Sequence, residues 1–380
     1  MLTRLFLWRI YIKILLYSLN FYPEPTGVGK YSGEMAEWLS ESGHDVKVIT
    51  SPPYYPAWKV DKEYNSWLYK YENIGKVKVC RCPIYIPENP TGFKRIVHLI
   101  SFAVSSFPII LKNIFWKPDL LILIEPTFFC SPSSILFSKI TRTKSWLHIQ
   151  DFEIDAAFNL EIIPKAFTGL IQKLESYAYK KFDVVSTISK SMIKKLVHKG
   201  IEKDQIIFFP NWSNIETISL NKDHGIEFKK NHNFNNDDCI FLYSGNMGKK
   251  QGLKLLLEAA KKLKRKTKIK FILCGDGAEK NELIDYSKKN ELSNCIFLPI
   301  QNTDNFNKML NSADAHIILQ KSEASDLVMP SKITNIIACG GYSIISADNG
   351  TELSNLVDQN KELGTRIRPS NLEDLIETIL

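Results

Sequence analysis

The sequence predicts an α/β protein with two doubly wound domains, each built on a parallel sheet. Its 380 residues are long for one domain and enough for two with substantial cores. Short apolar strands alternate with helical patterns along the chain, as they do in successive βαβ units. A polar stretch rich in Asn and Lys divides this alternation into two series. We therefore expect an N-terminal domain over residues 1–212, a linker or variable loop over 213–238 and a C-terminal domain over 239–380, with a central ligand cleft between the domains.

The first series opens with an apolar strand over Ile12–Ser18 and a loop rich in Pro and Gly. In that loop Gly27, Val28 and Gly29 stand where phosphate-binding glycines open a helix, but the third glycine of the dinucleotide fingerprint is absent. The turn therefore suits a sugar or a lipid-linked phosphate as well as a nucleotide. The expected helix of this unit is Tyr31–Ser42, and the later strands are Asp45–Thr50, Val77–Cys82, Leu120–Ile124, Ser145–Ile149, Val184–Ile188 and Ile206–Phe209.

Residues that directly follow the strands are predicted to line the site, because ligands of open α/β sheets bind beyond the carboxyl ends of the strands. They include Tyr54, which comes shortly after the second strand, and His148 and Asp151 around the end of a later strand. An imidazole and a carboxylate at such an edge can hydrogen-bond sugar hydroxyls or transfer a proton. The alternative is a polar pair that only ends a strand.

The second series contains a predicted phosphate site at the start of a short helix over Ile333–Cys339. Pro330, Ser331 and Lys332 precede this helix, and a Gly pair ends it. Its first amides would be unpaired, so with Lys332 they could bind an anion, although an ordinary capped helix is the alternative. The other expected elements are strands over Cys239–Tyr243, Lys270–Cys274, Cys295–Leu298, Ala315–Leu319 and Tyr342–Ser346, and a helix over Leu253–Lys266.

Composition and charge indicate where the protein is located and which partners it can have. Apolar residues make up 44% and charged residues 24%, as in globular proteins. The seven cysteines are odd in number and none has metal-site spacing, which favours reduced thiols, a cytoplasmic protein and no bound metal. The net charge is +8, and part of it is concentrated in a basic run over Lys249–Lys270. Such a run is typical of a solvated helix face, with contact to anionic lipid as the alternative. No nucleic-acid motif accompanies it, so nucleic acid is not expected as a partner.

Two apolar segments bear on contact with a membrane. Residues 1–11 are interrupted by Arg4 and Arg9, which fits either a start codon placed too far upstream or an interfacial anchor, so these residues need not belong to the protein. Residues 95–111 are apolar but short, and His98 and Pro108 interrupt them. We expect a buried or half-buried helix there, with peripheral contact to a membrane surface as the alternative.

The motifs, taken together and in order, resemble those of a known family. They are PEPTGVGKYSGEMA, VITSPPYYP, WLHIQDFEIDAAF, VSTISKSM, FFPNW, LYSGNMGKKQGL, ILCGDGAEK and DLVMPSKITN. The chain resembles the GT-B glycosyltransferases of family 4 over roughly Ile12 to Leu380, and more narrowly the WcaI-type transferases of colanic acid and exopolysaccharide biosynthesis. The resemblance implies two Rossmann-like domains facing a cleft, with a nucleotide-sugar donor, UDP- or GDP-linked, on the C-terminal domain and a lipid-linked sugar acceptor on the N-terminal domain.

The reaction implied by the resemblance is a retaining, metal-independent hexosyl transfer that needs no cofactor. Amides and lysines would stabilise the departing diphosphate, and that phosphate could itself help to deprotonate the acceptor hydroxyl. A covalent alternative would need a carboxylate, for which Asp151 is the nearest candidate. The implied catalytic residues are His148, Asp151, Lys250 and Lys332. The implied donor-binding residues are Gly245, Asn246, Gly248, Lys249, Gln251, Gly275, Asp276, Gly277, Asp326, Ser331, Asn335, Thr351 and Glu352, and the implied acceptor-side residues are Gly27, Val28, Gly29 and Tyr54.

The chain departs from the family pattern at several of these positions. Asn246 and Gln251 stand where many relatives have Arg and Lys, and Asn335 stands where many have a ribose-binding Glu, with Asp326 the nearest match to its partner acid. The chain also stops at IETIL, where relatives continue into a last helix. These departures leave open a non-catalytic sugar-nucleotide-binding or scaffold subunit of the same pathway. A sugar-nucleotide epimerase of similar fold is a further alternative, because it would keep the fold and change the reaction.

Overall fold

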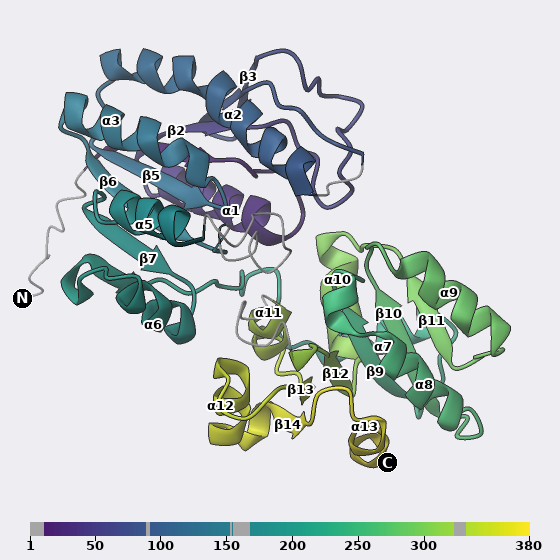
Figure 1. Ribbon diagram of the computed structural model, residues 1–380. Coiled ribbons are helices and arrows are strands. Elements are labelled where there is room, and N and C mark those ends of the chain that lie inside the picture. The colour runs from purple at the N-terminus through teal and green to yellow at the C-terminus, as the bar shows by residue number, and fades with distance from the viewer. Residues whose placement is uncertain (1–10, 89–91, 153, 155–167, 323–331) are drawn as a thin grey trace, which may run out of the picture. The chain divides into compact units, whose positions relative to one another are not determined.

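The computed structural model describes residues 11–88, 92–152, 154, 168–322 and 332–380. The chain folds into two compact units, one ending at Pro210 and the other beginning at Asn211 (Figure 1). Each unit has its own sheet, mostly parallel in the first unit and wholly parallel in the second, with helices on both faces. The predicted fold class, α/β with two doubly wound domains, is confirmed.

The first unit is built around an eight-stranded sheet with the strand order β3-β4-β2-β1-β5-β6-β7-β8. All neighbours are parallel except β3 and β4, which are antiparallel. Its elements are β1 (Lys13–Ser18), α1 (Gly27–Glu41), β2 (Asp45–Thr50), β3 (Lys70–Ile74), β4 (Val77–Arg81), α2 (Gly92–Lys112), β5 (Leu120–Glu125), α3 (Ser131–Thr141), β6 (Lys144–Ile149), α5 (Thr168–Tyr179), β7 (Val184–Thr187), α6 (Lys190–His198) and β8 (Ile206–Phe208).

Strand order determines which helix covers which face of this sheet. The connection from β1 to β2 runs in one direction along the sheet, and the connection from β4 to β5 runs in the other. Because parallel crossovers are right-handed, α1 and α2 cover opposite faces. The main core lies on the α2 face, where Leu15, Tyr17 and Leu123 of the sheet pack against Phe102 of α2 and Phe137 of α3.

The second unit contains a six-stranded parallel sheet with the order β11-β10-β9-β12-β13-β14. Alternate residues of its strands build two cores, because successive side chains point to opposite faces. Phe241 and Leu273 belong to one core, and Leu242 and Ile272 belong to the other. The elements are α7 (Lys222–Asn231), β9 (Cys239–Ser244), α8 (Lys254–Lys262), β10 (Ile269–Cys274), α9 (Lys280–Lys289), β11 (Cys295–Leu298), α10 (Thr303–Ser312), β12 (Ala315–Ile318), α11 (Lys332–Ala338), β13 (Ser343–Ser346), α12 (Glu352–Gln359), β14 (Gly364–Ile367) and α13 (Leu372–Ile379).

The segment 213–238, which we expected as a linker or variable loop, contains helix α7 and packs within the second unit. Asn221 caps α7, and Phe228 and Phe234 are buried with Met309 and Leu310 of α10. A Cβ on Gly225 would lie 2.3 Å from the Asn311 carbonyl oxygen, so the two helices approach closely there. The polar residues that suggested a linker surround a few apolar ones, and those few provide the packing.

Candidate active site

Two loops of the second unit meet at the carboxyl edge of its sheet, where the donor-binding residues were predicted. The Gly245 amide donates a hydrogen bond to the Cys274 carbonyl at 2.9 Å. The Met247 amide donates to the Asp276 carbonyl at 2.7 Å. The loop after β9 and the loop after β10 are thus joined by their backbones.

Glycine is required where these loops cross. Gly275 has φ +144°, and a Cβ there would lie 2.0 Å from the Gly245 carbonyl oxygen. Gly277 has φ +152°, and a Cβ there would lie 2.5 Å from the Met247 carbonyl oxygen. No other side chain fits at such a distance, and positive φ is costly for other residues. The motif glycines Gly245, Gly275 and Gly277 therefore allow the close backbone contact that shapes this edge.

Lys332 brings a positively charged group to the same loops. It is the first residue of α11, and its Nζ lies 3.9 Å from the centroid of the Tyr243 ring. A Cβ on Gly245 would lie 3.3 Å from this Nζ. Burial of the ammonium group lowers the pKa of Lys332 to about 7. An anion that arrived here would restore the charged form, because an opposite charge favours it.

The remaining residues of the loop after β9 are largely open to solvent. Lys249, Lys250 and Gln251 form a short 3₁₀ helix, and the Gly248 amide donates to the Gln251 side-chain oxygen at 3.2 Å. Lys249, Lys250 and Asn246 are exposed. Asp276 is exposed too, and its carboxylate accepts a hydrogen bond from the Gly277 amide at 2.8 Å.

Three other predicted donor residues lie on α11 and α12. The Ser213 hydroxyl donates to the side-chain oxygen of Asn335 at 2.8 Å. This oxygen is therefore hydrogen-bonded to the segment before α7. Thr351 is buried and caps α12 by accepting a hydrogen bond from the Ser354 amide. Glu352 lies in the first turn of α12. Asp326 and Ser331 lie outside the described residues.

In the first unit, His148 is more deeply buried than its position near a strand end suggested. The residue is fully enclosed, with Nδ1 2.8 Å from the Ser186 hydroxyl and Nε2 2.9 Å from the Gln150 amide nitrogen. Burial lowers the pKa of His148 to about 3, so the ring is neutral. We expected this imidazole to contact the sugar or handle a proton, whereas the structure has it inside the sheet, holding Gln150. The reason is that it is a residue of β6 itself, which lies between β5 and β7.

Asp151 is near enough to Tyr55, in the loop after β2, for its charge to affect the pKa of that ring. Burial and the Glu24 carboxyl raise the pKa of Tyr55, and the carboxylate of Asp151 adds a smaller effect in the same direction. Asp151 and Tyr55 are both half-buried. The predicted carboxylate and the half-buried ring thus both follow strands of the first sheet, Asp151 after β6 and Tyr55 after β2.

Glu24 is a candidate residue that we did not predict. It is 2% exposed, and its Oε1 accepts hydrogen bonds from the Tyr54 and Tyr55 amides at 3.0 Å and from the Asn20 side chain at 3.2 Å. Its Oε2 has no hydrogen-bond partner among the described residues. Burial raises the pKa of Glu24 to about 7. The sequence signal that could have indicated Glu24 is an acidic residue inside the loop of Pro and Gly that follows the first strand.

Tyr54 is held in the interior rather than open to a ligand. Its hydroxyl lies 2.9 Å from His98 Nε2, and its ring packs edge-on against His98 and Trp58. The Gly27 turn begins beside this loop, with φ +61° and the ring of Tyr55 3.9 Å from the position of an added Cβ. Gly29 packs on Glu24, since a Cβ there would lie 2.5 Å from Glu24 Oε2. The acceptor-side glycines and Tyr54 are therefore neighbours, and Tyr55 is the more accessible ring.

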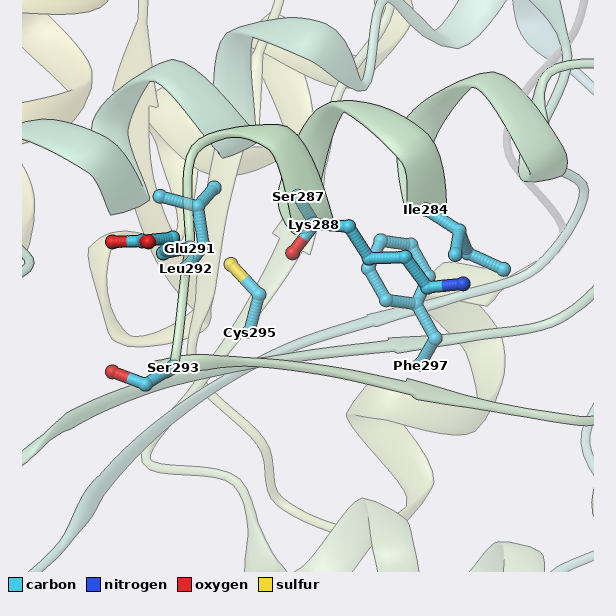
Figure 2. A pocket seen from close by; sticks show the side chains of 8 residues that line it. All are labelled: Ile284, Ser287, Lys288, Glu291, Leu292, Ser293, Cys295 and Phe297. Carbon is cyan, nitrogen blue, oxygen red and sulfur yellow. The ribbon is translucent and has the colours of Figure 1, made fainter.

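A separate pocket of the second unit lies away from these loops. Figure 2 shows it between α9 and β11, lined by apolar and polar side chains. It contains none of the predicted site residues, and its members are Ile284, Ser287, Lys288, Glu291, Leu292, Ser293, Cys295 and Phe297. Among the described residues, no group of three or more His, Cys, Asp or Glu could hold a metal ion.

Comparison with known proteins gives the family. Residues 26–212 match the glycosyl transferase 4-like domain, and residues 226–380 match the glycosyl transferases of group 1. Over 373 residues the chain is 42% identical to WcaI of Escherichia coli (strain K12), a glycosyl transferase assigned to colanic acid biosynthesis. That match covers 97% of this chain and 91% of WcaI. The chain belongs to glycosyltransferase family 4.

Several solved structures share the fold of this family 4 member. Sucrose-phosphate synthase from Thermosynechococcus elongatus has a TM-score of 0.74 at 14% identity, covering 97% of this chain and 88% of its own. Anabaena HepE in complex with UDP and glucose has a TM-score of 0.66 at 13% identity, covering 97% and 89%. WaaG, involved in lipopolysaccharide biosynthesis, has a TM-score of 0.68 at 12% identity, covering 96% and 89%. The predicted GT-B fold and the predicted resemblance are confirmed.

Proposed function

We propose that this glycosyltransferase moves a hexose from a UDP- or GDP-linked donor to a lipid-linked oligosaccharide in surface polysaccharide biosynthesis, with retention of configuration. The reaction would take place at the cytoplasmic face of the inner membrane. The 42% identity to WcaI supports the pathway. The HepE structure, which holds UDP and glucose, supports a nucleotide-linked donor. The observation that carries the proposal is the buried ammonium of Lys332 beside the glycine loops of the second unit.

The donor diphosphate would bind at the loop after β9 and the start of α11. Lys332 would meet it from the interior, and the exposed Lys249 and Lys250 would meet it from the solvent side. As the sugar leaves, negative charge develops on the diphosphate, and fixed positive groups and amides stabilise that charge. This arrangement supports a transfer that requires neither a metal ion nor a cofactor.

The acceptor would bind at the first unit, beside the Gly27–Gly29 turn, Tyr55 and Asp151. Tyr55 offers a half-open ring against which a sugar can stack, and Asp151 can accept a hydrogen bond from a sugar hydroxyl. The departing phosphate would accept the proton of the attacking hydroxyl, so no residue of the chain needs to act as a nucleophile. Asp151 is the carboxylate that a covalent route would use instead.

Binding of UDP and GDP in the presence of EDTA tests the donor site. We expect one of the two to raise the melting temperature of the chain, because a ligand of the native state stabilises it. Its affinity should fall by up to about tenfold per pH unit from pH 7 to pH 9, since Lys332 with a pKa of about 7 must gain a proton to pair with phosphate. Calorimetric titration of the wild type and of Lys332→Met measures this slope.

The matched control is Lys288→Met, an exposed lysine of α9 outside the proposed site. It should keep the affinity and the pH dependence of the wild type. Lys332→Met should bind weakly and without that slope. The assignment of Lys332 to the diphosphate site would be contradicted if Lys332→Met bound the nucleotide with the affinity of the wild type. Binding that depends on an added divalent metal would contradict it too.

A donor-binding subunit without transfer activity is the second candidate, and one contact favours it. The side-chain oxygen of Asn335 accepts a hydrogen bond from Ser213, which occupies the group expected to contact the ribose. Such a subunit would bind a nucleotide sugar yet neither transfer nor hydrolyse the sugar. Release of UDP or GDP from the donor, followed with and without a lipid-linked acceptor, separates the two candidates.

A further inference from the structure

Helix α2 has apolar side chains on two opposite faces. On one face, residues such as His98, Phe102 and Ile109 are buried in the core of the first unit. On the other face Phe93 is 76% exposed and Val104 is 67% exposed, and this exposed stripe also contains Ile100 and Phe107. These positions recur at helical spacing, so they form one continuous stripe. Figure 1 shows α2 on the outside of its unit.

The stripe continues onto β3 and the segment that leads into it. Trp67 is 72% exposed and Tyr71 is 62% exposed. The Tyr69 hydroxyl donates to the Ser105 carbonyl of α2 at 2.7 Å, and Lys112 Nζ lies 5.5 Å from the centroid of the Tyr71 ring. These contacts fix the two elements side by side. We name six of their exposed apolar residues the α2 surface: Trp67, Tyr71, Phe93, Ile100, Val104 and Phe107.

Positive charge accompanies the α2 surface. Residues 92–118 contain four basic side chains and no Asp or Glu; the basic residues are Lys94, Arg95, Lys112 and Lys117. Basic groups beside exposed Trp, Tyr and Phe match the chemistry of an anionic phospholipid surface, where the rings enter the headgroup layer and the cations meet phosphates. A second copy of the chain fits less well, because it would bring the same positive charges against these.

The core face of α2 decides how the helix can meet a bilayer. The stretch Gly92–Phe115 is long and apolar enough to cross a membrane. However, Phe102 and Ile110 are fully buried in the core, and His98 is hydrogen-bonded to Tyr54 and Tyr85. A crossing helix would have to give up these contacts, whereas a helix lying in the interface keeps them.

We infer that the α2 surface docks the chain on anionic phospholipid, with α2 lying flat in the headgroup region. This inference gives the proposed membrane contact a location, and it does not depend on the donor or the reaction. Exposed apolar side chains then enter the bilayer, while the opposite face of α2 stays in the core of the first unit.

Vesicle co-sedimentation of the full chain without nucleotide tests the inference. We expect binding to phosphatidylcholine vesicles that contain phosphatidylglycerol, and much weaker binding to pure phosphatidylcholine. Val104→Glu should lower the partition coefficient by about tenfold or more, because it puts a negative charge in the apolar stripe. Lys94→Glu and Lys112→Glu should each lower it by about fivefold or more, and added salt should reproduce this loss.

Trp38→Glu is the matched control, because Trp38 is 66% exposed on α1, which covers the opposite face of the sheet. It should bind vesicles like the wild type. Equal binding by Val104→Glu and the wild type would overturn the inference. So would a wild-type dimer that ignores vesicles and becomes monomeric in Val104→Glu, since the surface would then pair two copies. Nucleotide binding by Val104→Glu, measured separately by thermal shift, should be unchanged, which separates failure of this inference from failure of the proposed donor site.

Discussion

Glu24 links the residues around the proposed acceptor site. Its carboxyl holds the backbone of Tyr54 and Tyr55 after β2, and it packs against Gly29 in the first turn of α1. Burial makes ionisation costly, so the pKa of Glu24 rises from 4.5 to about 7. One buried group therefore couples the position of two loops to pH near neutrality.

Replacement of Glu24 by glutamine should remove this dependence on pH. A carboxyl whose pKa is raised in the folded state contributes stability below its unfolded pKa, and that contribution is lost as pH rises through the folded pKa. The free energy of unfolding of Glu24→Gln relative to the wild type should therefore rise by about 3 kcal/mol between pH 4.5 and pH 8. Urea unfolding across this range measures it.

Glu37→Gln, an exposed change on α1, provides the control. A difference between Glu24→Gln and the wild type that stays constant with pH would show that Glu24 ionises in the folded chain as it does in the unfolded one. The Gln oxygen can still accept the bonds from the Tyr54 and Tyr55 amides, so the variant tests the charge rather than the contact.

Single residues were the hardest feature to predict from the sequence. Lys332 could be found because a lysine at a helix start is a local pattern. The burial of His148 could not be found in this way, since it depends on β5 and β7, which lie far away in the sequence. Glu24 was missed for the same reason, because its partners Tyr54 and Tyr55 lie on another loop.

At the level of elements, the crossing of the loops after β9 and β10 depends on glycine. Gly275 has no room for a methyl group, because the Gly245 carbonyl lies where the Cβ would be. The amide of Gly275 is also bound, since it donates to the Leu298 carbonyl at 3.1 Å. The loop after β10 is thus fixed between β9 and β11.

Gly275→Ala should destabilise the second unit by about 3 kcal/mol, from overpacking together with an unfavourable φ. It should also weaken nucleotide binding, because the two loops would separate. Gly350→Ala is the matched control: Gly350 has φ +81° and nothing within 4 Å of an added Cβ, so only the backbone strain of about 1 kcal/mol applies. Chemical unfolding compares the variants, and equal losses would show that the close contact is not important.

Elements with strong local patterns were predictable, and weakly patterned ones were not. The strands β2 and β11 have the predicted bounds, because turn-forming residues flank each short segment rich in Val, Ile or Phe: Gly43 and Pro52 for β2, Asn294 and Pro299 for β11. Strand β3 was not predicted, since it is a half-exposed edge strand with the sequence KYENI. Helix α7 was not predicted either, because only two of its ten residues are buried.

At the level of the whole molecule, each unit has a core of its own. The second unit begins at Asn211, and Ile218, Phe228 and Phe234 complete its core on the α10 side. The segment before β9 therefore belongs to the folding of the second unit. It is more than a connection.

A fragment of residues 211–380 should fold by itself and bind UDP or GDP with the affinity of the full chain. A fragment of residues 239–380 should unfold without a cooperative transition, because loss of α7 uncovers Met309 and Leu310 of α10. Thermal melting monitored by circular dichroism, with and without nucleotide, distinguishes the two fragments. Similar melting curves would mean that α7 adds little to the core.

The packing of α7 on α10 also limits how this chain can recombine with its relatives. An exchange between Pro210 and Asn211 transfers both helices from one parent, so their close contact at Gly225 and Asn311 stays matched. An exchange just before β9 combines an α7 from one parent with an α10 from another. Chimeras that exchange donor specificity should therefore tolerate a breakpoint at the first position and fail at the second.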